Sequence, residues 1–220
     1  DPYDFSSDFG VVANTHTVTH SSFTIENQGG VDATGLVFGI SGGPYSVNTE
    51  NCPEPLPPAS PCQIDVDFSP VATGTHSGFD LEVDYNNGAA AAQMTHGLTG
   101  TSNSPASLSL SADVSSNFGT ITHGDTLDYL FTITNSGGVQ ATGLVESSLG
   151  APYTISGGSW PGLNGTCNGL GTLGPGSSCK IEVRFAPAGV GSQTYPDSIQ
   201  IDYNTGAAAA NTSLAITGQA

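Results

Sequence analysis

The same pattern occurs twice along this chain. Residues 23–36 read FTIENQGGVDATGL and residues 131–144 read FTITNSGGVQATGL, at an offset of 108. The match continues to the end of each copy, where LTG at 98–100 aligns with ITG at 216–218. A repeat of this length is as long as a small domain, so the 220 residues predict two homologous domains. We expect the first over residues 1–101 and the second over residues 106–220.

Short alternating runs of apolar and polar residues predict strands in both copies. Residues 63–68 read QIDVDF and residues 79–85 read FDLEVDY, and the second copy has IEVRF at 181–185 and IQIDY at 199–203. A period of two places apolar and polar side chains on opposite faces of a sheet. Gly, Pro and Asn bound these runs, and no window of twelve residues has helical periodicity. The fold class is therefore all-β, with two tandem immunoglobulin-like β-sandwich domains.

The four cysteines form one close pair in each half: Cys52 with Cys62, and Cys167 with Cys179. Three connectivities are possible, and only pairing within each half leaves the two halves unlinked. A zinc site would need four ligands at shorter spacing. We therefore expect two disulfides, which place the protein in an oxidising compartment, secreted or at the cell surface. We expect Asp1 to follow a removed leader or to begin an excised fragment.

The charge balance excludes several classes of partner. The chain has 19 acidic residues against Lys180 and Arg184 alone, for a formal net charge of −17. Binding to nucleic acid or to an anionic membrane surface requires clusters of Lys and Arg, so we expect neither. The longest runs of small residues, Ala89 to Ala92 and Ala207 to Ala210, are far shorter than a membrane span. We expect no membrane insertion by this segment.

The region from Cys167 resembles a known family. Residues 167–204 read CNGLGTLGPGSSCKIEVRFAPAGVGSQTYPDSIQIDYN, followed by LAITGQA at 214–220. This stretch is similar to the bacterial repeats of choice-of-anchor D proteins and the related ASH (HYDIN-type) Ig-like domains. The first copy has the same elements, although its loop PEPLPPASP at 53–61 is Pro-rich where the family is usually Gly-rich. The resemblance implies extracytoplasmic repeats of bacterial surface or secreted proteins, with no catalytic residues and no cofactor.

The acidic residues on two predicted strands are the strongest candidates for a metal site. Alternate residues of a strand project from one face, and oxygen clusters of this kind can hold Ca²⁺. The candidates are Asp65, Asp67, Asp80, Glu82 and Asp84. No D-x-D-x-D-G loop occurs, and the second copy has Glu182, Arg184, Ser198, Gln200 and Asp202 at these positions. We therefore expect a solvated strand face and no bound metal.

The histidines and the single tryptophan are further candidate site residues. His16 and His20 would lie about 13 Å apart on a strand, too far to bind one metal ion. The other histidines, His76, His96 and His123, are isolated, so we expect all five to be exposed and without a catalytic role. Trp160 lies in the inserted loop GSWPG, where it can either stack on a ligand or plug the end of the sandwich.

These features favour a non-catalytic protein. No G-x-S-x-G motif occurs, and no acidic residue lies in an aromatic-rich cleft pattern. The leading hypothesis is a structural or adhesive tandem repeat of a bacterial surface or secreted protein. Its partners would be neighbouring repeats of the same protein, or a surface protein or glycan. The alternative is a module that binds glycan or protein through the loops near Trp160 and the Ala-rich hairpin tips.

Overall fold

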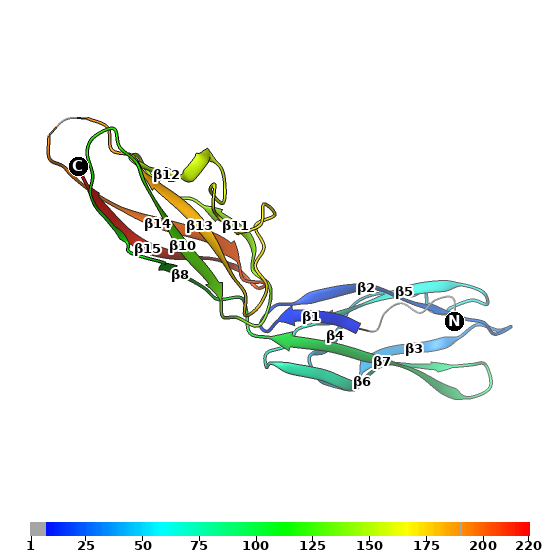
Figure 1. The fold of residues 1–220 in the computed structure, drawn as a ribbon. Coiled ribbons are helices and arrows are strands. Elements are labelled where there is room, and N and C mark those ends of the chain that lie inside the picture. Colours follow the sequence, from blue (N-terminus) through cyan, green and yellow to red (C-terminus); the bar gives the residue numbers. More distant parts are fainter. Residues whose placement is uncertain (1–7, 190) are drawn as a thin grey trace. The chain divides into compact units, whose positions relative to one another are not determined.

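The protein folds as two compact units that divide between Asn103 and Ser104 (Figure 1). The computed structural model describes residues 8–189 and 191–220. Within this part, strands make up nearly all of the regular structure, and a 3-10 turn, η1 (Ser156–Gly158), is the exception. None of the described helical structure has the length and apolarity of a membrane span. The all-β, Ig-like fold expected from the sequence is confirmed.

The first unit packs two sheets against each other. Its strands are β1 (Asp8–Ala13), β2 (Val18–Glu26), β3 (Thr34–Ile40), β4 (Tyr45–Asn51), β5 (Pro61–Phe68), β6 (Gly74–Asn86) and β7 (Ala91–Asn103). One sheet has the order β1-β7-β6-β3 and the other β2-β5-β4. The pair β1 and β7 is parallel, whereas the other strand pairs of this unit are antiparallel.

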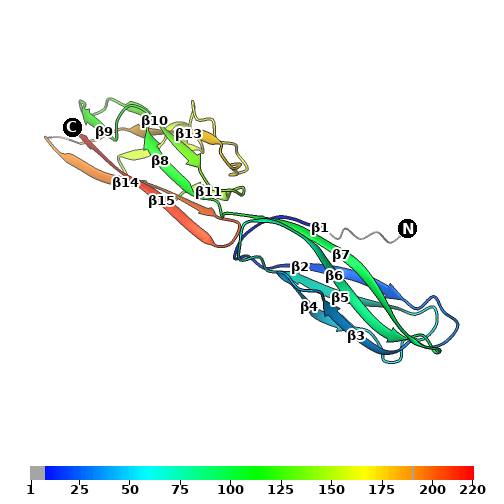
Figure 2. The same cartoon turned by 90° about the horizontal axis from the view of Figure 1, so that it is seen from below.

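The second unit repeats this arrangement with one strand more (Figure 2). Its strands are β8 (Leu108–Ala112), β9 (Asn117–Thr120), β10 (Leu127–Asn135), β11 (Thr142–Glu146), β12 (Tyr153–Ile155), β13 (Ser178–Phe185), β14 (Thr194–Asn204) and β15 (Ala209–Gln219). The sheets have the orders β12-β13-β10-β8 and β11-β14-β15-β9. Strands β9 to β15 therefore correspond in order to β1 to β7. The described residues of the first unit include no counterpart of β8.

The core of each unit follows from the alternating pattern of its most buried strand. On β5, Ile64, Val66 and Phe68 have no solvent exposure. The matching residues Ile181, Val183 and Phe185 of β13 are equally buried. Each set lies on the sheet face that packs on the other sheet, because side chains two residues apart point the same way.

One glycine in each unit lets an aromatic ring lie directly on the backbone. A Cβ on Gly100 would come within 2.8 Å of the Phe68 ring, and one on Gly218 within 2.6 Å of the Phe185 ring. Real Cβ atoms do not approach carbon this closely, so neither position can hold a side chain without moving its ring. The same rings stack on Tyr45 and Tyr153, with centroids 4.8 Å apart in both units.

Because each unit has its own sheets and core, we expect each to fold alone. Residues 1–103 and 104–220, produced separately, should each unfold in one cooperative transition followed by circular dichroism. A first fragment that is unfolded in isolation would show instead that the two units share a core.

Candidate functional site

A disulfide closes one loop in each unit. The bonds join Cys52 to Cys62 and Cys167 to Cys179, with sequence separations of 10 and 12. Cys62 and Cys179 are the second residues of β5 and β13, and both are buried. This is the pairing expected from the spacing. Each bond therefore ties the loop that precedes a central strand to the start of that strand.

A buried asparagine holds the same loop in the second unit. The Asn135 side chain has no solvent exposure and donates hydrogen bonds to the carbonyls of Val139 and Leu173. Its Oδ1 atom accepts hydrogen bonds from the N–H groups of Ser107 and Gly137. All four bonds are 2.9 to 3.1 Å long. A buried amide costs free energy unless it is satisfied in this way, so the residue joins three segments to the end of β10: the residues before β8, the turn after β10 and the disulfide loop.

Asn27 has the same role in the first unit, with one partner fewer. Its Nδ2 atom donates to the carbonyls of Val31 and Leu56, and its Oδ1 atom accepts from the N–H of Gly29. No counterpart of Ser107 is found among the described residues of this unit. In both units the asparagine of the aligned motif N-x-G-G-V thus binds the loop that contains the disulfide. From the sequence alone, these residues indicated only a turn.

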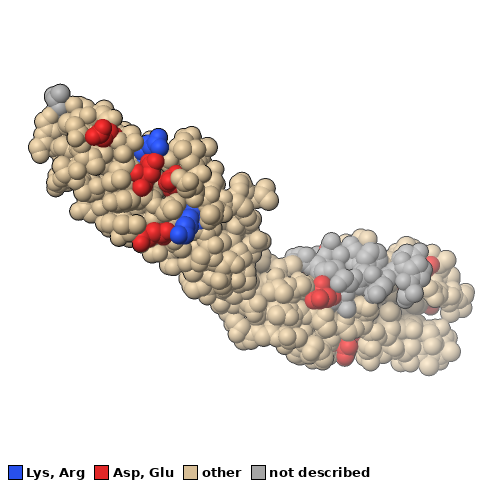
Figure 3. All heavy atoms as spheres, in the orientation of Figure 1, with Lys and Arg blue, Asp and Glu red and all other residues tan. Residues whose placement is uncertain are grey.

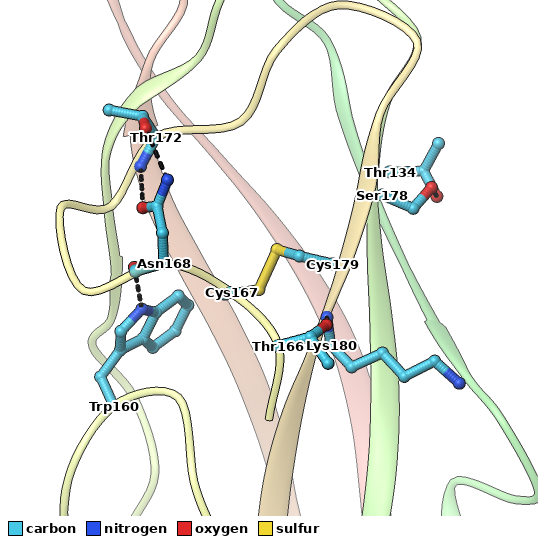
Figure 4. The surroundings of a disulfide bond; sticks show 9 residues. All are labelled: Thr134, Trp160, Thr166, Cys167, Asn168, Thr172, Ser178, Cys179 and Lys180. Atoms are coloured by element: carbon cyan, nitrogen blue, oxygen red, sulfur yellow. Dashed lines mark hydrogen bonds between the residues drawn. A yellow bond between two sulfur atoms is a disulfide. The ribbon is translucent and has the colours of Figure 1, made fainter. Parts of the chain in front are cut away.

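Trp160 belongs to a loop that folds onto itself beside the second disulfide (Figure 4). Its indole Nε1 donates a hydrogen bond of 3.2 Å to the carbonyl of Asn168, the residue after Cys167. The Asn168 side chain in turn bonds the backbone N–H and the hydroxyl of Thr172. Trp160 is half-buried, so its ring neither fills the core at the end of the sandwich nor lies fully exposed to a ligand.

The same inserted loop buries a carboxylate on the outer face of β13. Glu182 is only 5% exposed and accepts hydrogen bonds from the backbone N–H and the side-chain amide of Asn164. A Cβ on Gly162 would lie 2.8 Å from the Glu182 backbone, so the loop lies directly on the strand. Glu182 therefore lies on a covered part of its strand face, unlike the residues of the first unit for which a solvated face is expected. The longer loop was visible in the sequence, but the face that it covers was not.

Both basic residues of the chain are paired with aspartates in the second unit (Figure 3). Lys180 contacts Asp113, which also accepts a hydrogen bond from Thr132. Arg184 makes two hydrogen bonds, of 2.8 and 2.7 Å, to the two oxygens of Asp128. The hydrogen bond from Lys180 lowers the pKa of Asp113, and that from Arg184 lowers the pKa of Asp128. The two pairs thus link β13 to Asp128 of β10 and to Asp113, the residue that follows β8.

The five acidic residues proposed as calcium ligands do not form one cluster. Asp65 and Asp67 lie on β5, whereas Asp80, Glu82 and Asp84 lie on β6, in the other sheet. The apolar residues of both strands face the core, so the two acidic rows project from opposite outer faces of the sandwich. The two strands therefore do not pair with each other. Among the described residues no group of three His, Cys, Asp or Glu side chains could hold a metal ion.

Two of these acids take part in hydrogen bonds along their own sheets. The side-chain amide of Asn48 donates to Asp67 at 3.1 Å, and that of Gln93 donates to Asp84 at 2.8 Å. Both are bonds between side chains of neighbouring strands, β4 with β5 and β7 with β6. They stabilise strand pairing on exposed faces.

The histidines are less exposed than expected. Only His96 is fully exposed, whereas His16, His76 and His123 are half-buried. The His20 side chain lies outside the described residues. His76 Nε2 is 2.9 Å from the Ser102 hydroxyl, and His123 Nε2 is 2.6 Å from the carbonyl of Gly191. The first contact joins β6 to the end of β7, and the second joins the turn after β9 to the loop before β14.

One tyrosine in each unit holds the two sheets together at the same place. The hydroxyl of Tyr45 donates to the carbonyl of His76, and that of Tyr153 to the carbonyl of Tyr195. Burial raises the pKa of Tyr45 to about 12, with a further contribution from Asp8. Burial raises the pKa of Tyr153 to about 12 in the same way, with a contribution from Asp197.

The structure therefore defines a class: two-sheet Ig-like sandwiches in which disulfides, buried amides and tyrosine hydroxyls hold the loops to the sheets. The profile of the HYDIN/CFA65/VesB-like Ig-like domain family matches residues 106–219, just over half of the chain. The chain belongs to this family, and the resemblance seen in the sequence is confirmed. No curated protein sequence matches it.

Several solved structures are similar to parts or all of the chain. VesB protease from Vibrio cholerae is 23% identical, with a TM-score of 0.37, over 51% of this chain and 32% of its own. The chain thus spans about a third of the length of that protein. A protein of unknown function from Porphyromonas gingivalis W83 is 13% identical over 95% of this chain and 98% of its own, with a TM-score of 0.37. An ASH/PapD-like domain of human CEP192 is 17% identical over 52% and 84%, with a TM-score of 0.33.

The Asp128 pair gives the second unit a pH-dependent contribution to stability. Because Arg184 lowers the pKa of Asp128 in the folded state, this contribution is present above the pKa of an unfolded Asp, about 4, and is lost as the pH falls through the lowered value. We expect Asp128→Asn to lower the free energy of unfolding by about 1 kcal/mol at pH 7. Denaturant titrations should show the difference shrinking as the pH falls below about 4 and disappearing below the lowered pKa of Asp128, while the exposed Asp125→Asn control should match the parent chain throughout.

The separation of the acidic rows leads to a prediction for calcium. Carboxylates on opposite faces cannot share one ion, so Ca²⁺ should act on this protein by charge screening alone. Melting temperatures in CaCl2 should equal those in NaCl of the same ionic strength. A saturable shift specific to Ca²⁺, lost in Asp65→Asn or Glu82→Gln variants, would disprove this expectation.

Proposed function

We propose that this chain is a non-catalytic structural repeat of a secreted or surface-exposed bacterial protein, where it spaces other parts of that protein. The observation that carries the proposal is the shared use of polar side chains in the two units. Asn27 and Asn135, and likewise Tyr45 and Tyr153, make matching hydrogen bonds to the backbone at matching places. Groups committed to loops in this way support a scaffold and not a reaction centre.

The disulfides and the charge support the proposed location. Disulfides persist in oxidising compartments, where a small sandwich gains stability from the loop that each one closes. A net charge of −17 keeps such a protein soluble and monomeric. An extracytoplasmic spacer needs both properties.

Recognition of a glycan or a protein by the Trp160 loop is the second candidate function. It is supported by exposed apolar side chains in the same region, since Leu163 is 71% exposed and Leu170 is 85% exposed. The Ala-rich hairpin tips, which connect β6 to β7 and β14 to β15, are the other candidate contact regions. Exposed apolar residues on loops are a common feature of binding surfaces.

A binding screen distinguishes the two functions. The labelled full chain, applied to a glycan array and to fixed host-cell surfaces, should give no signal above background, because a spacer has no ligand of its own. Trp160→Ala should leave this result unchanged and lower the melting temperature by a few degrees, since the bond to Asn168 is lost. Leu170→Ala, which removes an exposed side chain of the same loop region, should change neither. A signal that Trp160→Ala abolishes would establish the second function in place of the first.

A further inference from the structure

The Ala-rich hairpin turns of the two units are closed in the same way. The N–H of Asn87 donates to the carbonyl of Ala90 between β6 and β7, and the N–H of Thr205 donates to that of Ala208 between β14 and β15. Asn87 Oδ1 also accepts the N–H groups two and three residues further along the chain. Thr205 Oγ1 accepts the equivalent pair in the second unit. Either residue type can therefore close this turn.

A glycine follows the closing residue in both turns. Gly88 has a φ of 88° and Gly206 a φ of 86°, in the left-handed region that glycine adopts without strain. A Cβ on Gly88 would also lie 2.8 Å from the side chain of Val31. The turn of the first unit thus favours glycine at position 88, whereas position 87 accepts either Asn or Thr. With asparagine there, the turn contains an Asn-Gly dipeptide, which the matching turn of the second unit lacks.

An Asn-Gly dipeptide can modify itself. The backbone nitrogen of the glycine loses its proton to water or hydroxide and attacks the side-chain Cγ atom of the asparagine. The bond from Cγ to Nδ2 then breaks, Nδ2 leaves as ammonia with a proton from water, and a five-membered succinimide ring remains. Water opens this ring at either carbonyl, which gives aspartate or isoaspartate. Glycine favours the attack because it has no side chain to obstruct the approach of the two atoms.

Three Asn-Gly dipeptides occur in the chain, and their asparagines differ in how the leaving nitrogen is held. Asn164 Nδ2 donates a hydrogen bond of 2.7 Å to the buried carboxylate of Glu182. Asn168 Nδ2 donates one of 2.8 Å to the hydroxyl of Thr172. Within the part of the chain that the structure describes, Asn87 makes its side-chain hydrogen bonds through Oδ1 alone. A bond to the leaving nitrogen must break before ammonia departs, so Asn164 and Asn168 are protected and Asn87 is not.

The hydrogen bonds that Asn87 does make favour attack on its Cγ atom. Its Oδ1 accepts two backbone N–H groups at 3.0 and 2.9 Å. Negative charge develops on this oxygen as the nitrogen of Gly88 attacks, and donors aimed at a developing oxyanion stabilise it. The N–H of Gly88 is held by Asn86 Oδ1 at 2.9 Å, and this bond must open first. Residues 86–90 are all exposed, so the bond opens locally and water reaches the turn.

We propose that Asn87 is a modification site of the first unit, where the chain converts its own β6–β7 turn through a succinimide to aspartate and isoaspartate. Isoaspartate adds a CH2 group to the main chain between residues 87 and 88, which changes the path of the turn. Both products add a carboxylate to a chain whose net charge is already −17. This chemistry is independent of the structural role proposed above.

Incubation of the full chain at mildly alkaline pH tests the selectivity. Residues 1–103 contain no Lys or Arg, so chymotrypsin, which cleaves after Tyr85, is used to release the turn for mass spectrometry. Conversion at Asn87 should be at least about fivefold faster than at Asn164 or Asn168, because each of these must first lose a hydrogen bond. Synthetic peptides of the three segments should differ by less than about twofold, since all three have glycine after the asparagine.

Two results of this experiment would overturn the proposal. One is a folded chain in which Asn87 reacts no faster than Asn164 or Asn168. The other is the same order of rates in the three peptides as in the folded chain, because the selectivity would then come from the local sequence and not from the hydrogen bonds of the fold.

Two variants exchange the closing residues of the matched turns. Asn87→Thr gives the first unit the residue that the second unit has, so it should keep the parent melting temperature and form no product between β6 and β7. Thr205→Asn creates an Asn-Gly dipeptide between β14 and β15, and it should deamidate there faster than Asn164 of the same unit. Melting curves show that each variant folds. A folded Thr205→Asn chain that stays unmodified in this turn would show that the turn does not supply the reactivity and would disprove the proposal.

Discussion

The buried amide of Asn135 is the interaction on which the second unit is organised. A primary amide has two donors and one acceptor oxygen, and out of contact with water each must find a protein partner. Here the partners come from the segment before β8, the turn after β10 and the disulfide loop. Because all of these segments are irregular, no sheet ladder would otherwise fix them. The disulfide adds a covalent limit to how far the last of them can move.

Much of the fold was predictable because it rests on local patterns. The alternation in residues 63–68 and 181–185 identified the two most buried strands, and cysteine spacing indicated how the loops close. The layout of the sheets was not readable in this way. Asp67 and Asp80 are 13 residues apart, but whether their strands pair in one sheet or cross to the other depends on the sandwich topology. Glu182 shows the same limit, since its burial comes from a loop whose path no periodicity encodes.

The two units differ in charge although they share a fold. Both cations lie on β13, so the second unit has local ion pairs while the first carries acidic charge alone. Like charges on every copy of the first unit oppose the approach of two copies in solution.

The contact between Gly100 and the Phe68 ring has a consequence for how such repeats can diverge. A side chain at position 100 is tolerable only if position 68 loses its ring, and loss of the ring alone would leave a void beneath β7. Each single change is costly, whereas the two together can compensate, as is general for residues in direct contact. Gly218 and Phe185 repeat the arrangement. The two positions of each pair should therefore change together in evolution. Replacing either residue alone would pass through a destabilised protein.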